Sequence, residues 1–279
     1  MNRTRLGQAA LAGITVAAAV ALCPGAASAI PGRTMVSNTS VSDSATFKGA
    51  DAQCPAGTVI LGGGARITGG DNHVRLNQMG PQKNMWVVAA SEDAYGYAGD
   101  WSVTTWAICA PAPAGYAIVN QDLYVNTWGT VSVPCPAGRV VLGMGGLVWA
   151  TNIPNGVLDT VRTDNGMTNV LVTAYHDETM PAPGTSMKIA AIAICAFPPP
   201  DHTLVTGGTV PSSSDKTRDV ICPLGTLPSG LGGHLDGGSG EVGFTEIAPL
   251  RTGMRVTARE DSTGFPGTWY VEPYMICAG

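Results

Sequence analysis

The stretch Cys54-Pro55-Ala56-Gly57, followed by Gly62 and Gly64, decides the fold because the same pattern occurs three times in the chain. The second copy is Cys135-Pro136-Ala137-Gly138 with Gly143 and Gly145, and the third is Cys222-Pro223-Leu224-Gly225 with Gly230 and Gly232. Each copy ends on a second cysteine in an apolar setting: Cys109, Cys195 and Cys277. The chain therefore consists of three copies of one module.

Residues 1–29 have the composition of a secretory signal peptide. Arg3 and Arg5 supply the positive start, a run rich in Ala, Val and Leu follows, and Ala27-Ser28-Ala29 is a small-residue cleavage site. Cys23 lies inside this segment, so six cysteines remain, and an even number in an exported chain predicts structural disulfides. We therefore expect a secreted, extracellular protein.

The charge of the mature chain bears on its partners. Removal of Arg3 and Arg5 takes the formal net charge from -5 to -7, and the remaining Lys and Arg residues are scattered. Nucleic acids and anionic membranes are bound by clustered Lys and Arg, so neither is an expected partner. No stretch after the signal peptide stays apolar long enough to span a bilayer, so we expect no membrane insertion.

Each module has the pattern of strands and turns. The modules are expected at residues 30–113, 114–200 and 201–279. Short runs rich in Val, Ile, Thr and Trp alternate with Gly, Pro and Asp, which favours strands over helices. The predicted strands are 45–54, 59–67, 73–79, 85–91 and 101–109 in module one; 130–135, 140–147, 157–162, 169–175 and 188–195 in module two; and 218–222, 230–235, 241–246, 254–259 and 269–277 in module three.

The repeated proline and glycines have mechanical roles. In Cys-Pro-x-Gly the proline presets φ for a turn and the glycine tolerates positive φ, so we expect this segment to reverse the chain between the first two strands. Gly62 and Gly64 fall inside a predicted strand, where glycine marks a bulge or the close approach of another backbone.

We therefore expect an all-β fold of three homologous modules of about 80 residues each. A pseudo-threefold β-prism, in which each module gives one sheet to a shared core, is favoured over three small β modules in a row. The short, proline-rich junctions Ala110-Pro111-Ala112-Pro113 and Phe197-Pro198-Pro199-Pro200 are stiff spacers, which favours the closed form.

Repetition also selects a disulfide pairing. Three copies of one module should fold alike, so we predict Cys54 with Cys109, Cys135 with Cys195, and Cys222 with Cys277. A loop of this size gains roughly 4 kcal/mol in the chain-entropy model, which a module with a thin core needs. The alternative, cyclic pairing across module boundaries, would bring Cys54 to Cys277 and requires a tightly closed ring.

Two sets of repeated residues are candidates for ligand binding. Asp93, Asp177 and Asp261 follow the fourth predicted strand of each module, where they could accept hydrogen bonds from sugar hydroxyls, help to hold Ca²⁺, or form Asx turns with their own backbone. Trp101 and Trp269 each stand eight residues further on, where an indole could stack on a sugar or fill the core. Turn and core roles are the alternatives to a ligand-binding role.

The sequence contains none of the common catalytic motifs. It lacks a Gly-x-Ser-x-Gly elbow, a His-Glu-x-x-His pair, a P-loop and a dinucleotide fingerprint, and none of its histidines has metal-ligand spacing. We therefore predict no cofactor, no metal and no catalytic residues, and we favour a protein that is not an enzyme.

The Cys-Pro-x-Gly turns, the glycine-rich strand that follows them and the closing Ala-x-Cys resemble the repeats of disulfide-containing proteins exported by high-GC Gram-positive bacteria. A weaker similarity is to the vitelline-membrane outer-layer type of β-prism, which implies three sheets around a shared axis.

These features lead to three hypotheses about function. The first is a non-enzymatic, lectin-like binder of glycans or cell-surface ligands, because threefold repetition multiplies weak sites. The second is an exported interaction or structural protein, such as an inhibitor, a toxin component or a surface-layer element. The third is a hydrolase whose site carries no recognisable motif.

Overall fold

The computed structural model describes residues 30–149, 156–177, 179 and 187–279 of the chain. The signal peptide predicted over residues 1–29 lies outside this part. Within the described residues the secondary structure is entirely strands and turns, which confirms the all-β prediction. In the same residues no helix has the length and apolar character needed to cross a membrane.

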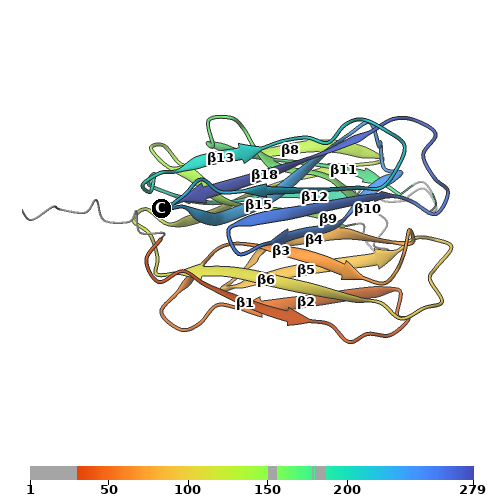
Figure 1. Ribbon diagram of the computed structural model, residues 1–279, viewed down its shortest axis with the longest axis horizontal. Helices are drawn as coiled ribbons and strands as arrows, with labels where there is room; N and C mark the ends of the chain where they lie inside the picture. The colour runs from red at the N-terminus through yellow and green to blue at the C-terminus, as the bar shows by residue number, and fades with distance from the viewer. Residues whose placement is uncertain (1–29, 150–155, 178, 180–186) are drawn as a thin grey trace, which may run out of the picture.

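The strands form three six-stranded sheets, and each sheet combines strands of two modules (Figure 1). The first sheet, from modules one and three, has the order β1 (Thr34–Thr39), β6 (Ser102–Ala110), β3 (Val59–Thr68), β16 (Val242–Pro249), β17 (Gly253–Glu260), β14 (Lys216–Ile221). The second, from modules one and two, has the order β2 (Phe47–Gln53), β5 (Met85–Glu92), β4 (Val74–Gln82), β9 (Val140–Trp149), β12 (Met187–Ala196), β7 (Ala117–Val125). The third, from modules three and two, has the order β13 (Thr203–Thr206), β18 (Tyr270–Ala278), β15 (Leu227–Asp236), β10 (Gly156–Thr163), β11 (Asn169–His176), β8 (Trp128–Pro134).

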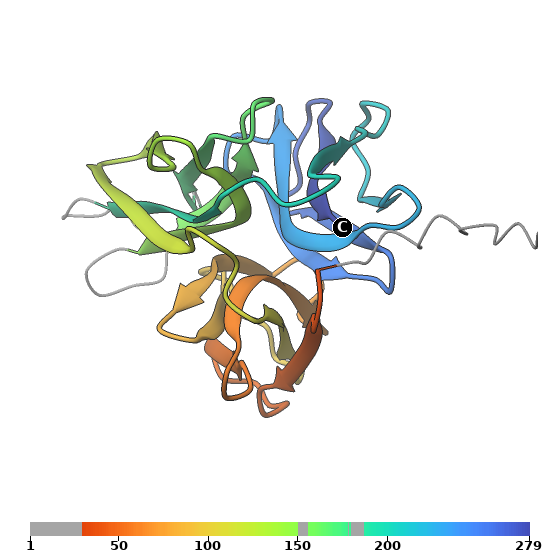
Figure 2. The ribbon, with the colours of Figure 1, turned by 90° about the vertical axis from the view of Figure 1, so that its left-hand side faces the viewer.

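Each module is therefore divided between two sheets, whereas the sequence predicts one whole sheet per module. The two three-stranded halves of a module face each other, as Trp86 of β5 faces Gly63 of β3 and Phe244 of β16 faces Gly233 of β15. Every sheet then continues into the next module, so the three modules close into a ring of lobes around a central axis (Figure 2). This sharing confirms the closed arrangement and excludes three modules in a row.

The first strand of each module, β1, β7 and β13, was not among the predicted strands. All three lie at the edge of a sheet. Their residues are mostly exposed or half-buried, and β7 contains Asn120, Gln121 and Asp122, which are not typical strand formers. A strand with one neighbouring strand and little buried surface needs few apolar residues, so its alternation of apolar and polar residues is weak.

The Cys-Pro-x-Gly segment makes a turn but not a hairpin. The Thr58 N–H donates to the Pro55 carbonyl at 3.1 Å, and Gly57 has a φ of 81°. Gly57 therefore has the predicted role, while Pro55 is the first residue of the turn rather than the second. Because β2 and β3 belong to different sheets, the turn connects the half of the module in one sheet to the half in another.

The predicted disulfides are confirmed. Cys54 is bonded to Cys109, Cys135 to Cys195 and Cys222 to Cys277, with Cα–Cα distances of 5.7, 5.7 and 5.8 Å. In each module the first cysteine follows an edge strand of one sheet and the second lies on a strand of another sheet. Each disulfide therefore ties the two halves of one module together.

The repeated glycines lie where the three modules meet. A Cβ on Gly62 would overlap the backbone of Ser229, a Cβ on Gly143 would overlap Leu61, and a Cβ on Gly230 would lie 2.6 Å from the Leu142 carbonyl oxygen. Strands β3, β9 and β15 therefore touch one another in a cycle, backbone against backbone. The close approach predicted for these glycines is confirmed.

We expect Gly62→Ala to lower the free energy of unfolding by about 4 kcal/mol, because its methyl group has only backbone to displace. Gly57→Ala is the matched control: its Cβ would meet nothing within 4 Å, so only its positive φ costs energy, about 1 kcal/mol. Urea denaturation of both variants measures the difference. Equal losses would show that the axis tolerates a side chain.

Candidate functional site

The three repeated aspartates lie in buried turns. Asp93, Asp177 and Asp261 are each less than 10% exposed. Their Oδ1 atoms accept hydrogen bonds from the backbone N–H groups of Tyr95 at 3.0 Å, of Thr179 at 3.0 Å and of Thr263 at 2.9 Å. These are the Asx turns that the sequence offers as the alternative to a ligand-binding role.

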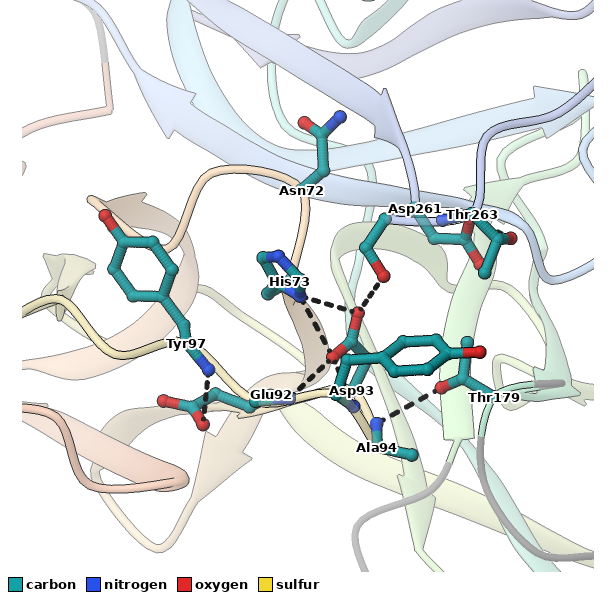
Figure 3. A network of polar contacts seen from close by, with 12 residues as sticks. Asn72, His73, Glu92, Asp93, Ala94, Tyr97, Thr179, Asp261 and Thr263 are labelled. Atoms are coloured by element: carbon teal, nitrogen blue, oxygen red, sulfur yellow. Dashed lines mark hydrogen bonds and ion pairs between the residues drawn. The ribbon is translucent and has the colours of Figure 1, made fainter.

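The Asp turns of different modules meet in one polar network. The Ser262 hydroxyl of module three donates to Asp93 Oδ2 at 2.6 Å, and the Ala94 N–H of module one donates to the Thr179 hydroxyl of module two at 3.2 Å. Figure 3 shows Asp93 between His73 and the turn of Asp261, with His73 Nδ1 at 3.1 Å from both carboxylate oxygens. The network holds the modules together at one end of the axis.

Arg75 supplies a positive charge to this end of the molecule. Arg75 is 3% exposed. Its Nη2 atom lies 3.9 Å from Asp261 Oδ2, and its Nη1 atom donates a hydrogen bond to the Asn72 carbonyl at 2.8 Å. Burial lowers the pKa of the guanidinium, and the carboxylates of Asp177 and Asp93 oppose that shift. One arginine of module one therefore faces acidic turns from all three modules.

We expect Arg75→Met to lower the free energy of unfolding by about 3 to 5 kcal/mol, because it leaves buried carboxylates without a counter-charge. Arg66→Met is the control, since Arg66 pairs with Glu246 with its side chain 40% exposed, and its loss should cost at most about 1 kcal/mol. Thermal denaturation of the two variants decides the matter. An Arg75 variant as stable as the Arg66 variant would contradict this role.

The repeated tryptophans are core residues with a buried polar partner. Trp101 and Trp269 are at most 1% exposed. Their Nε1 atoms donate to Glu92 Oε1 and Glu260 Oε1, both at 2.8 Å. The rings fill the ends of their modules, and neither presents a face to solvent.

A different set of residues lines an open pocket of about 340 Å³ on the third sheet. Modules two and three both contribute to it. The lining side chains are aromatic, hydroxyl-bearing or acidic: Trp128, Thr130, Asp159, Thr160, Thr173, Tyr175, His234, Asp236 and Ser239. This pocket is the strongest candidate for a functional site.

Strand register places these side chains together. Trp128 of β8 is paired with Tyr175 of β11, and Thr160 of β10 is paired with His234 of β15 across the boundary between the modules. Asp159 occupies the position where the register of β10 shifts. The extra residue of such a bulge re-aims its side chain, which puts the Asp159 carboxyl on the pocket wall.

The aromatic wall has one ring open to solvent. The Trp128 residue is 58% exposed, and its ring stacks on Tyr175 with centroids 5.9 Å apart and an interplanar angle of 18°. A second aromatic contact lies on the other side, where Tyr270 meets the His234 ring edge-on at 6.3 Å. A flat, half-open aromatic surface therefore borders the polar floor.

The polar floor contains a buried carboxyl group with a raised pKa. Burial raises the pKa of Asp159 to about 7, a hydrogen bond from Thr160 opposes the shift, and the charge of Asp236 adds to it. The Thr160 hydroxyl lies 2.8 Å from Asp159 Oδ1 and 2.9 Å from His234 Nδ1. Burial also lowers the pKa of His234, and the charge of Arg162 acts in the same direction.

The equivalent positions of the other two sheets do not form this site. At the boundary between modules, the pair Thr160 and His234 is replaced by Glu246 and Arg66 in the first sheet and by Gln78 and Leu147 in the second. In the first sheet, Arg66 and Glu246 form an ion pair at this position. The pocket is therefore a property of one seam and not of the repeat.

The residues of this pocket could not be found from the repeats. Asp159, His234 and Asp236 have no counterpart of the same type in the other modules, and Trp128 matches only Phe47 of module one. The signal in the sequence is therefore the presence of acidic and imidazole residues at places where the other modules have different residue types. Within the described residues, no group of three or more His, Cys, Asp or Glu side chains could hold a metal ion.

No protein-family model matches the chain, and no curated protein matches it either. The resemblance to exported repeat proteins therefore stays a prediction.

We expect the buried Asp159 carboxyl to make stability depend on pH. Its pKa is about 7 in the folded protein and near 4 when unfolded, so between these values the folded state holds the extra proton and stability falls as pH rises. Relative to Asp159→Asn, the wild type should lose on the order of a few kcal/mol between about pH 4 and pH 7. Urea denaturation at several pH values measures this, and parallel curves for the two proteins would contradict it.

Proposed function

We propose that the protein is a secreted, lectin-like binder that takes a glycan in the pocket of the third sheet. The observation that carries the proposal is the Trp128 ring, open on one side, stacked on Tyr175 and bordered by Asp159 and Asp236. A sugar has an apolar C–H face and a rim of hydroxyl groups. An aromatic surface beside hydrogen-bonding groups matches both.

The polar groups of the pocket support the same conclusion. The Thr130 and Thr173 hydroxyls lie 2.8 Å apart on the pocket wall, and each can both donate and accept. Asp236 is an acceptor at the opposite side. Hydroxyl-rich ligands are recognised by such mixed donors and acceptors.

The three disulfides are typical of extracellular proteins, which supports secretion and access to extracellular glycans.

The test is a glycan array with the mature protein, followed by titration of the best ligand. We expect Trp128→Ala to weaken binding about tenfold or more, because it removes the exposed aromatic face. Tyr124→Ala is the matched control, since Tyr124 is an aromatic residue that is 63% exposed on edge strand β7 and should leave affinity unchanged. Absence of binding to every glycan would favour an interaction or structural protein instead.

A second candidate function is hydrolysis of a glycosidic bond. It is favoured by two carboxyl groups in one pocket, Asp159 with its pKa raised by burial and Asp236, because such hydrolysis uses a pair of carboxyl groups. Release of new reducing ends from the glycan that binds best distinguishes an enzyme from a lectin.

A further inference from the structure

The pocket on the third sheet has an acidic lining. The described residues that line it include Asp159 and Asp236, and none of them is Lys or Arg. The carboxyls also act on the neighbouring phenols: burial raises the pKa of Tyr175, and the charges of Asp159 and Asp236 raise it further. Burial and Asp236 raise the pKa of Tyr270 in the same way. A ligand with positive charge would relieve this accumulation of negative potential.

Asp159 has an unused acceptor. Asp159 is 5% exposed, and the Thr160 hydroxyl donates its hydrogen bond to Oδ1. Oδ2 has no hydrogen bond from any described residue. A buried carboxylate with one neutral donor is poorly compensated, and burial raises its pKa to about 7. An ammonium group in the pocket would supply the missing donor and the missing charge.

The aromatic surface favours the same kind of ligand. Cations are attracted to the faces of Trp and Tyr rings, and Trp128 and Tyr175 form a stacked pair beside the carboxyls. A neutral sugar uses the apolar face of such a pair and can donate hydroxyl hydrogen bonds to the carboxyl groups, but it does not neutralise their charge. A sugar with a protonated amine uses the same face and also neutralises the charge.

We propose that the pocket selects glycans that carry free amino groups, such as 2-amino-2-deoxy sugars without the N-acetyl group, with the ammonium held by Asp159 and Asp236. This inference rests on the proposed glycan-binding function and names the chemistry of the ligand.

Binding of an ammonium should displace the proton of Asp159. The charged and titratable groups that face this carboxyl and its neighbours are Asp236 and His234 of β15, Tyr175 of β11, Arg162 of β10, and Tyr270 and Glu272 of β18. Because the free carboxyl has a pKa of about 7, binding below that pH releases a proton, and affinity rises as pH approaches 7. A neutral ligand that accepts a hydrogen bond from protonated Asp159 would show the opposite dependence.

Two matched probes test the proposal: β-1,4-linked glucosamine tetrasaccharide and the N-acetylglucosamine tetrasaccharide of the same linkage. By isothermal titration calorimetry at about 0.15 M salt, where long-range attraction is screened, we expect the amino sugar to bind about tenfold or more tightly. Between about pH 5 and pH 6, where the sugar amine stays protonated, its affinity should rise about fivefold or more, with proton release detected in buffers of different ionisation enthalpy.

The variants separate the pocket from general attraction to an acidic protein. Asp159→Asn should abolish the proton release, and Asp159→Asn and Asp236→Asn should each reduce the preference for the amine. Asp51→Asn is the control, because it removes an exposed carboxylate from the second sheet and should change nothing. A preference that survives both pocket variants would overturn the proposal, as would equal affinity for the two tetrasaccharides, which leaves glycan binding itself intact. If neither binds, the amine proposal fails, and the glycan array decides the proposed function separately.

Discussion

The close contact of three backbones at Gly62, Gly143 and Gly230 is the constraint on which the rest of the structure depends. Each of these residues lies against the strand of the next module, so the contact closes only when all three modules contribute. With β3, β9 and β15 at this distance, each can pair with a strand of a neighbouring module. The sharing of sheets, the burial of the Asp turns and the seam that forms the pocket all follow from this approach.

The parts of the fold that the sequence predicts are those that repetition and local chemistry determine. The five later strands of each module are short runs of apolar and β-branched residues bounded by turn residues, and the disulfides follow because three equal copies must pair in equal ways. The exposed edge strands β1, β7 and β13 escape prediction because they bury little surface. The division of each module between two sheets also escapes, because alternation along a strand says which face is buried and not which strand lies beside it.

The same reasoning explains the fate of the site residues. Asp93 and Trp101 have counterparts in other modules because the architecture needs them. The aspartate accepts hydrogen bonds from the backbone N–H groups of a turn, and the tryptophan fills the end of a module. Their carboxylate and indole groups are bound to the protein itself. Residues that are free to act on a ligand lie where the copies differ, as Thr160 and His234 differ from Glu246 and Arg66 at the same seam. The repeat supplies the scaffold, and the residues of the proposed site lie where the copies differ.

The cyclic sharing of sheets has a consequence for the origin and assembly of the chain. Every disulfide lies within a module, while every sheet crosses between modules. A module taken alone would keep its covalent bond but would expose two unpaired strands, such as β3 and β4, each of which is a template for association. Two further copies of the module would cover both. The geometry is that of a homotrimer whose subunits are joined in series, and in one chain each of the three seams can carry a different pair of residues.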